Sequence, residues 1–198
     1  MDQIYKNKPL VIITAPSGAG KTTLTRYLLE IYDVLKFSVS STTRPIRWSE
    51  INGVDYHFIR LDQMEQKISD WKMLEREEVY PGNIYGTDKN ELKKIRDTGH
   101  IPLLDIDVKG ALNIKAIRPN ILSIFISPPD INTLQNRLKE RNTDTEENIK
   151  IRVDKANYEM NYADSFDMKI INDDLNKAKK EISEVVWTRL EKINWIDG

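Results

Sequence analysis

Residues 15–22 (APSGAGKT) have the types and spacing of a loop that binds nucleotide phosphates. Gly18 and Gly20 let the backbone curl, so that successive N–H groups point inward at phosphate oxygens. Lys21 can reach the β- and γ-phosphates, and the hydroxyl of Thr22 can bind Mg²⁺. The usual first glycine of this pattern is an alanine here, so the backbone at that position must keep a negative φ. The predicted phosphate-binding residues are Ala15, Pro16, Ser17, Gly18, Ala19, Gly20, Lys21, Thr22 and Thr23.

The segments on either side of this loop are those that a phosphate site needs. An apolar run at residues 10–13 predicts a buried strand before it, and residues 23–29 carry a helical pattern after it. A strand, a glycine-bearing loop and a helix in this order favour a phosphate site over an ordinary turn. The helix would begin near Lys21 and direct its positive dipole end at the loop.

A second signal is the apolar run 101–107, which ends in two carboxylates, Asp105 and Asp107. Such a strand end places hard oxygen ligands beside the Mg²⁺ that bridges nucleotide phosphates. Acidic residues also end strands for solubility, but the phosphate loop in the same chain favours a metal site formed with Thr22. Side chains two apart in a strand point to the same side, so either carboxylate could contact the metal or a second substrate.

Five arginines flank two segments that are broken by proline or turn residues. They are Arg44, Arg47, Arg137, Arg141 and Arg152. Phosphoryl transfer between two nucleotides collects much negative charge, and planar guanidinium groups match phosphate oxygens. A single arginine is by default a solvated surface residue. Five of them at two sites, in a chain of near-zero net charge, favour contact with phosphate.

Composition narrows the classes of function. The chain has 198 residues, which suits one domain, and its formal net charge of −1 gives no reason to expect a nucleic-acid partner. It has no cysteine and two histidines, so disulfides are excluded and a zinc site is not expected. The sequence shows no signal-peptide pattern and no membrane-spanning run, so we predict a cytoplasmic protein without membrane contact.

Apolar runs alternate with helical patterns along most of the chain. Continuous apolar runs indicate strands buried on both faces, so we predict an α/β fold with a parallel sheet flanked by helices. Residues 37–87 differ and predict a small, mostly β insertion, in which 41–48 are irregular and Asn52-Gly53 forms a hairpin turn. Strands are predicted at residues 10–13, 35–40, 54–59, 73–80, 84–87, 101–107, 121–126 and 168–171. Helices are predicted at residues 61–71, 91–97, 108–117, 128–141 and 146–163 and after the cap at 172–174.

Five motifs in one order make the chain resemble guanylate kinases over essentially its whole length. They are residues 15–22, 38–44 with Arg47, 52–56, 82–87, and 137–141 running into 143–147. The resemblance implies one domain, residues 1–198, built on a phosphate-loop sheet with a helical lid. Its implied parts are a core (1–36, 88–138 and 158–198), a GMP-binding insertion (37–87) and a lid (139–157).

The resemblance also implies an activity, the phosphorylation of GMP and dGMP by ATP with Mg²⁺ as cofactor, in purine nucleotide metabolism. ATP would bind at the phosphate loop with Asn172 near its adenine, and the transferring phosphoryl group would be stabilised by Lys21, Arg137, Arg141 and Arg152. Guanine would be read by Glu75 with hydroxyl groups, because a carboxylate can accept from both donors on one guanine edge. The implied contacts of GMP are Ser40, Arg44, Arg47, Tyr56, Glu75, Tyr85, Gly86, Thr87 and Asp107.

Some alternatives stay open. Pro81 adds one residue relative to the family pattern, so Glu77 and Glu78 remain alternatives to Glu75 as the residue that reads guanine. Another nucleoside-monophosphate kinase would share the core and the lid but should lack the guanine-reading set. A non-catalytic binding module of the same fold would typically have a degraded phosphate loop, whereas Lys21 and Thr22 are intact here. The sequence predicts either a monomer or a homodimer.

Overall fold

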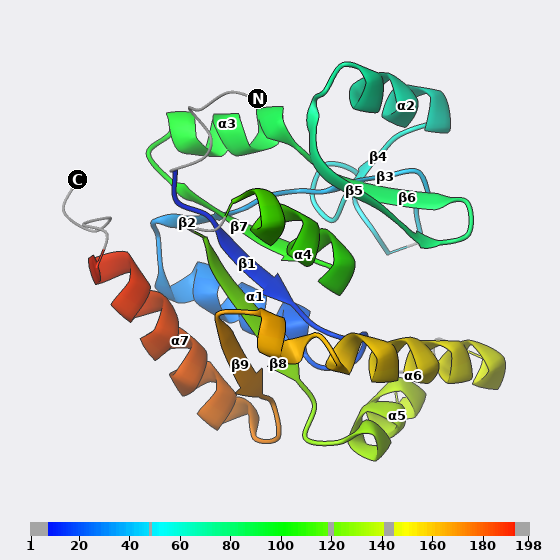
Figure 1. The fold of residues 1–198 in the computed structure, drawn as a ribbon, viewed down its shortest axis with the longest axis vertical. Coiled ribbons are helices and arrows are strands. Elements are labelled where there is room, and N and C mark those ends of the chain that lie inside the picture. Colours follow the sequence, from blue (N-terminus) through cyan, green and yellow to red (C-terminus); the bar gives the residue numbers. More distant parts are fainter. Residues whose placement is uncertain (1–7, 48, 119–120, 141–144, 193–198) are drawn as a thin grey trace.

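The computed structural model describes residues 8–47, 49–118, 121–140 and 145–192 of the chain. The elements in these ranges form two sheets with helices around them (Figure 1). The smaller sheet and a pair of helices lie on two sides of one end of the larger sheet (Figure 1). This arrangement confirms the predicted α/β class.

The larger sheet holds the strands predicted to form the core. They are β1 (Val11–Thr14), β2 (Leu35–Phe37), β7 (Ile101–Ile106), β8 (Leu122–Ser127) and β9 (Met168–Ile171). Their order is β2-β7-β1-β8-β9, and every neighbouring pair is parallel, as predicted. β2 ends at Phe37 rather than at residue 40. The carboxyl ends of β1 and β7 therefore lie side by side in the middle of the sheet.

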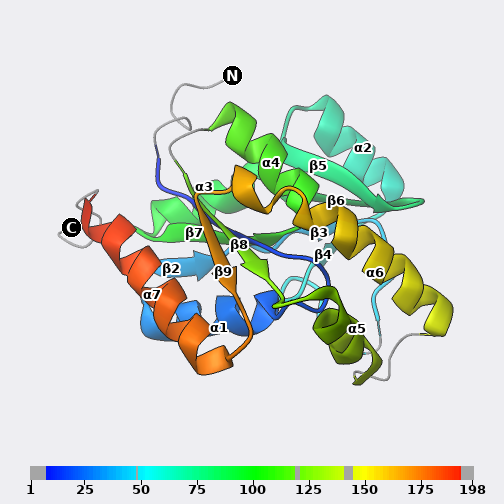
Figure 2. The ribbon, with the colours of Figure 1, turned by 60° about the horizontal axis from the view of Figure 1, so that its bottom comes forward.

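Helices cover both faces of this sheet (Figure 2). They are α1 (Lys21–Ile31) and α7 (Leu175–Lys192) on one face, and α3 (Lys89–Asp97) and α4 (Val108–Ile117) on the other. Alternate residues of β1 serve the two faces, because Val11 and Ile13 pack with α1 and α7 whereas Ile12 packs with α3 and α4. Burial on both faces explains the unbroken apolar runs in the sequence.

The smaller sheet is built from residues 41–88, nearly the segment predicted as a mostly β insertion at 37–87, whereas Phe37 belongs to β2. Its elements are β3 (Ser41–Thr42), β4 (His57–Phe58), β5 (Met73–Tyr80), β6 (Asn83–Asp88) and the helix α2 (Leu61–Ser69). The strand order is β4-β3-β6-β5, with β6 antiparallel to both of its neighbours. The predicted strands at 73–80 and 84–87 are confirmed.

Two predictions for the start of this insertion are wrong. Residues 41–48 are not wholly irregular, because Ser41 and Thr42 form β3, held between β6 and β4. The strand predicted at 54–59 is only the two residues of β4, and it pairs with β3 in the parallel direction. The Asn52-Gly53 turn therefore does not join two antiparallel strands. It closes locally instead, where the N–H of Gly53 donates to the carbonyl of Tyr56 at 2.8 Å.

The remaining helices are α5 (Ile131–Glu140) and α6 (Glu146–Met160), which lie beside each other. They share a small apolar cluster of their own, formed by Leu134, Leu138, Ile149 and Ala156. α6 ends at Met160 rather than at residue 163, and Ala163–Ser165 form a short 3₁₀ helix. α2 ends at Ser69 rather than at residue 71, because Trp71 has a φ of +56°, which no α-helix allows.

Candidate active site

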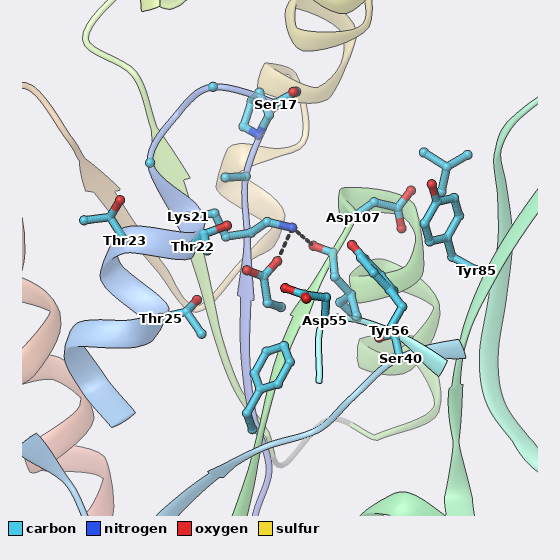
Figure 3. A pocket seen from close by; sticks show the side chains of 18 of the residues that line it. Ser17, Lys21, Thr22, Thr23, Thr25, Ser40, Asp55, Tyr56, Tyr85 and Asp107 are labelled. Atoms are coloured by element: carbon cyan, nitrogen blue, oxygen red, sulfur yellow. Dashed lines mark hydrogen bonds and ion pairs between the residues drawn. The ribbon is translucent and has the colours of Figure 1, made fainter. Parts of the chain in front are cut away.

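A cavity of about 570 Å³ opens where β1 and β7 end, between the smaller sheet and α6 (Figure 3). We call the part formed by residues 15–23 the loop end, and the part formed by Ser40, Tyr56, Glu75 and Tyr85 the second-sheet end. The predicted site residues that line the cavity are Ala15, Pro16, Ser17, Gly18, Gly20, Lys21, Thr22, Thr23, Ser40, Arg47, Tyr56, Glu75, Tyr85, Gly86, Asp105, Asp107 and Arg152. Those that lie outside its lining are Ala19, Arg44, Thr87, Arg137 and Asn172.

The backbone of the loop end has the conformation that its glycines predict. Gly18 and Gly20 have φ values of +94° and +96°, in the region that side chains disfavour. Ala15 is not among the residues with positive φ, so alanine replaces the usual first glycine without strain. α1 begins directly after Gly20, and its first three residues, whose N–H groups have no partner within the helix, line the cavity.

Asn172 lies behind this loop. Its side chain is only 5% exposed and donates from Nδ2 to the carbonyl of Ala19 at 2.8 Å. A Cβ atom at Gly20 would overlap that same nitrogen, so glycine is needed there for close approach as well as for φ. Asn172 thus supports the loop from the sheet side, and the expected contact with adenine stays a prediction.

The ammonium of Lys21 lies at the centre of the cavity (Figure 3). It forms an ion pair with Asp105 at 2.5 Å and donates to the carbonyl of Ile106 at 3.1 Å. Burial lowers the pKa of Lys21, but the charge and hydrogen bond of Asp105 outweigh burial and hold the pKa above its usual value. Lys21 is therefore charged and already aimed between the two ends of the cavity.

Asp107 comes directly after β7 and caps α4, where its Oδ1 accepts from the N–H of Gly110 at 3.0 Å. Asp105, Asp107 and the Thr22 hydroxyl all line one cavity, as the strand period predicts. Within the described ranges, no three His, Cys, Asp or Glu side chains come close enough to hold a metal by themselves. Two carboxylates and a hydroxyl fit Mg²⁺, because this ion fills its remaining positions with phosphate oxygens and water.

Arg44 is held beside the second-sheet end. It donates to both carboxylate oxygens of Glu50, at 2.7 and 2.5 Å, and from Nε to the hydroxyl of Tyr85 at 3.0 Å. Its guanidinium also lies 5.1 Å from the ring centre of Tyr56. The hydrogen bonds to Glu50 raise the pKa of Arg44 although burial opposes them. Arg44 thus fixes two groups of the cavity wall, while Arg47 is exposed at the rim.

Glu75 is the buried carboxylate of the second-sheet end. Its Oε1 accepts from the hydroxyl of Thr87, on the neighbouring strand, at 2.7 Å. Burial raises the pKa of Glu75 to about 7, and the charge of Asp107 adds to this, although Thr87 lowers it. Gly86, beside Thr87, lets β5 approach, because a Cβ there would lie 2.7 Å from the backbone oxygen of Glu75.

The two alternatives to Glu75 have other partners. Glu77 forms an ion pair with Lys109 at 2.7 Å and accepts from Asn113 at 2.5 Å, both on α4. Glu78 accepts from the backbone N–H of Gly82 at 2.6 Å in the turn after β5. Of the three glutamates, only Glu75 lines the cavity.

The arginines predicted on the helices have different outcomes. Arg152 on α6 reaches the loop end and donates to the hydroxyl of Ser17 at 2.7 Å. Arg137 on α5 lies outside the cavity lining, and its Nη1 is buried without a hydrogen-bond partner. Arg141 lies outside the described residues. The predicted gathering of arginines at the phosphates is therefore supported at Arg152 and stays a prediction for the others.

Two charged residues of α6 were not predicted. Lys155 and Glu159 line the cavity, and Glu159 is 6% exposed. A signal was present in the sequence, because both lie on the helical face of Arg152, three and seven residues further on.

Comparison with known proteins identifies the family. The family model of guanylate kinase matches residues 6–189. The chain belongs to the guanylate kinase family. It is 44% identical over 176 residues to a guanylate kinase of Salinibacter ruber, covering 88% of this chain and 93% of the relative. It is 41% identical over 188 residues to a guanylate kinase of Rickettsia felis, covering 94% and 97%.

A solved structure gives the same result. A crystal structure of guanylate kinase from Anaplasma phagocytophilum matches with a TM-score of 0.74 and 29% identity, covering 92% of this chain and 86% of that chain. As a member of the guanylate kinase family, the chain is a nucleotide-binding transferase with kinase activity. Within the described residues, no helix is both long and apolar enough to cross a membrane.

Proposed function

We propose that this member of the guanylate kinase family transfers the γ-phosphoryl group of ATP to the phosphate of GMP or dGMP. One observation carries the proposal: a single cavity joins a phosphate loop with an intact Lys21 to a buried carboxylate, Glu75. The first feature suits a nucleoside triphosphate and the second suits a guanine base. Both substrates would therefore meet across Lys21.

The loop end would hold ATP. Backbone N–H groups at the start of α1 and the positive end of its dipole suit the β- and γ-phosphates. Lys21 would exchange its ion pair with Asp105 for phosphate oxygens, and Arg152 is already beside Ser17 of the loop. The transferring group would thus be surrounded by fixed positive charge.

The second-sheet end would hold GMP. Guanine presents the donors N1–H and N2–H₂ on one edge, and Glu75 can accept from both when it is ionised. Tyr56, Tyr85 and Arg47 line the same part of the cavity and suit the phosphate of GMP. Arg44 would hold that wall in place and reach the phosphate by releasing Glu50.

The reaction needs positioning and charge neutralisation. The phosphate oxygen of GMP attacks the γ-phosphorus in line, the bond to the β–γ bridging oxygen breaks, and ADP leaves, with no covalent enzyme intermediate. Thr22, Asp105 and Asp107 would hold Mg²⁺, which when bound neutralises charge on the nucleotide phosphates. Lys21 and Arg152 act on the oxygens of the group in transit.

Phosphoryl transfer between two nucleotides requires that water be kept away from the reacting phosphates. We expect the insertion, residues 37–87, and the lid, residues 139–157, to close over the substrates, because exposed ATP would be hydrolysed. We place the protein in the cytoplasm, where ATP and GMP are turned over, as a monomer or a homodimer in purine nucleotide metabolism.

The test is a coupled assay of ADP formation with GMP, dGMP, AMP, UMP and CMP as acceptors. We expect kcat/KM for GMP to exceed that for AMP by at least about a hundredfold, because a carboxylate cannot pair with the N1 acceptor of adenine. Omission of Mg²⁺ should abolish turnover. Equal rates with AMP or UMP would make the chain a different nucleoside-monophosphate kinase.

A further inference from the structure

Among the charged side chains of the cavity that the mechanism above does not use, two lie on α6. Lys155 and Glu159 lie one turn apart on α6 and form an ion pair, Nζ to Oε1, at 3.5 Å. Both line the cavity. Glu159 is nearly buried, and a buried carboxylate is costly unless a cation or a hydrogen bond compensates it. The burial of this carboxylate is unfavourable for folding, so its presence in the cavity suggests that the pair contributes to function.

The position of the pair follows from the course of α6. The C-terminal end of this helix lies against the end of the larger sheet, and its N-terminal end points away from the sheet (Figures 1 and 2). Arg152 forms a hydrogen bond with Ser17 at the loop end. Glu159 lies about 10 Å further along the helix axis, where the negative charge of Asp107 contributes to its raised pKa. Lys155 lies between them on the same helical face.

The charges around Glu159 come from three elements. They are Lys155 on α6, Lys21 at the start of α1 and Asp107 at the end of β7. Burial raises the pKa of Glu159 to about 6, and the two lysines oppose this rise. The pair therefore belongs to the same electrostatic cluster as Lys21, at the place where donor and acceptor phosphates would meet.

We propose that Lys155 is a further catalytic residue, which binds an oxygen of the phosphoryl group in transit, and that Glu159 is the positioning residue that aims its ammonium. This inference rests on the proposed function, since it needs ATP at the loop end and GMP at the second-sheet end. Lys155 forms no covalent bond and transfers no proton. It supplies a point charge between those of Lys21 and Arg152, while the bond to the β–γ bridging oxygen breaks and the bond to GMP forms.

The experiment compares Lys155→Gln, Lys155→Arg and Lys150→Gln in steady-state kinetics with ATP and GMP. Lys150 is the matched control, because it lies on the same helix but is exposed and outside the cavity lining. We expect Lys155→Gln to lower kcat about 10- to 100-fold, with KM for either substrate changed less than about twofold. Lys155→Arg should recover most of kcat, and Lys150→Gln should match the unmodified protein. A Lys155→Gln protein with unchanged kcat overturns the inference.

Glu159→Gln tests the positioning role with little change of shape. We expect a smaller loss of kcat, and no further loss when it is added to Lys155→Gln, because Glu159 acts through Lys155. Equal losses from Glu159→Gln with and without Lys155 would contradict that role. Should Glu159→Gln fail to fold, the Lys155 variants decide alone. The unmodified protein separates the two levels. If it forms ADP from ATP in a GMP-dependent reaction and Lys155→Gln leaves kcat unchanged, only this inference fails. If the unmodified protein forms no ADP with GMP, the proposed function fails.

Discussion

At the loop end, one continuous segment, residues 15–23, supplies the lining residues, and its backbone turns at two glycines with positive φ. The second-sheet end is assembled differently. Ser40, Tyr56, Glu75 and Tyr85 come from different strands and turns of the smaller sheet, and each contributes a side chain. The first end therefore suits the phosphates of any nucleotide, and we expect the second to determine which base is accepted.

This difference assigns separate tasks to the two ends. Backbone groups cannot be removed by substitution, so at the loop end we expect substitutions of the glycines and of Lys21 to impair activity. At the second-sheet end, substitution of any one of the lining side chains should change the affinity for the acceptor or the choice of acceptor. We expect the following changes to these two ends to have effects that decrease from the first to the last.

Lys21→Ala should have the largest effect. It removes the point charge that faces both ends of the cavity, and we expect kcat to fall about a thousandfold while the fold persists. Lys36→Ala, at an exposed lysine of β2, is the control and should leave kcat unchanged. A folded Lys21→Ala protein with near-normal GMP phosphorylation would remove the basis for the loop end as the ATP site.

Arg152→Ala and Arg47→Ala should affect different kinetic constants, because the two arginines line different ends of the cavity. Arg152 touches the loop end, so its loss should lower kcat about 10- to 100-fold with KM for GMP nearly constant. Arg47 lines the second-sheet side, so its loss should raise KM for GMP about tenfold with a smaller effect on kcat. An Arg152→Ala protein that weakens only GMP binding would show that α6 serves the other end.

Gly20→Ala tests the backbone of the loop end through stability. The new Cβ would meet both a positive φ and the amide of Asn172, and we expect a loss of about 2–4 kcal/mol in the free energy of unfolding. Gly82→Ala, in the turn between β5 and β6, has a φ of +78° but open space, so it should cost only about 1 kcal/mol. Denaturant titration of both variants measures the difference. Equal losses in the free energy of unfolding would mean that the side chain of Asn172 does not restrict the space at Gly20.

The pH dependence of GMP binding should be the smallest effect, and it belongs to the second-sheet end alone. The pKa of Glu75 is raised to about 7, so the folded protein binds a proton that guanine must displace. We expect GMP to bind about tenfold more weakly at pH 6 than at pH 8, with ATP affected less. The phosphate of GMP also ionises near pH 6, so Glu75→Gln, which keeps only that contribution, is the control.

The same raised pKa bears on stability in the absence of substrate. A carboxyl whose pKa is higher in the folded protein than in the unfolded chain stabilises the fold when it is protonated. The free energy of unfolding should therefore fall as the pH rises from about 4.5, the usual pKa, to about 7. In Glu75→Gln this part of the pH dependence should be absent. An identical pH profile for both proteins would contradict the burial of an ionisable Glu75.

The same contrast between the ends explains what could be predicted from the sequence. The loop end is contiguous, so the strand, the glycine-bearing turn and the helix around residues 15–22 were predicted correctly. Asp105 and Asp107 line the same cavity, as their spacing predicts, and the binding roles of these residues stay predictions. The second-sheet end depends on strand pairing across many residues. Asn52-Gly53 predicts a hairpin by local turn chemistry, but β4 pairs in parallel with β3, and no local signal encodes that choice.

Side chains on helices were the hardest to predict. Apart from their spacing from Arg152, nothing in the sequence distinguishes Lys155 and Glu159 from charged residues on a helix surface. They line the cavity only because of where α6 lies against the larger sheet. Trp71 reads as the last residue of a helical stripe, yet it is 80% exposed with a positive φ. Hydrophobic spacing predicts that a helix exists, whereas its end and its neighbours depend on tertiary packing.

The central claim, that the second-sheet end reads guanine through Glu75, is tested most directly by kinetics of Glu75→Gln, Glu77→Gln and Glu78→Gln with GMP and AMP. A bond to a charged group contributes about 1.5–3 kcal/mol, and Glu75→Gln also sets an amide NH₂ against a guanine donor. We therefore expect Glu75→Gln to lower kcat/KM for GMP by about two to three orders of magnitude and to raise the ratio of AMP to GMP activity. Glu77→Gln and Glu78→Gln should stay within about threefold of the unmodified protein, because their carboxylates face Lys109 and Gly82. A near-neutral Glu75→Gln, with the loss at Glu77 or Glu78 or at none of the three, would contradict the account.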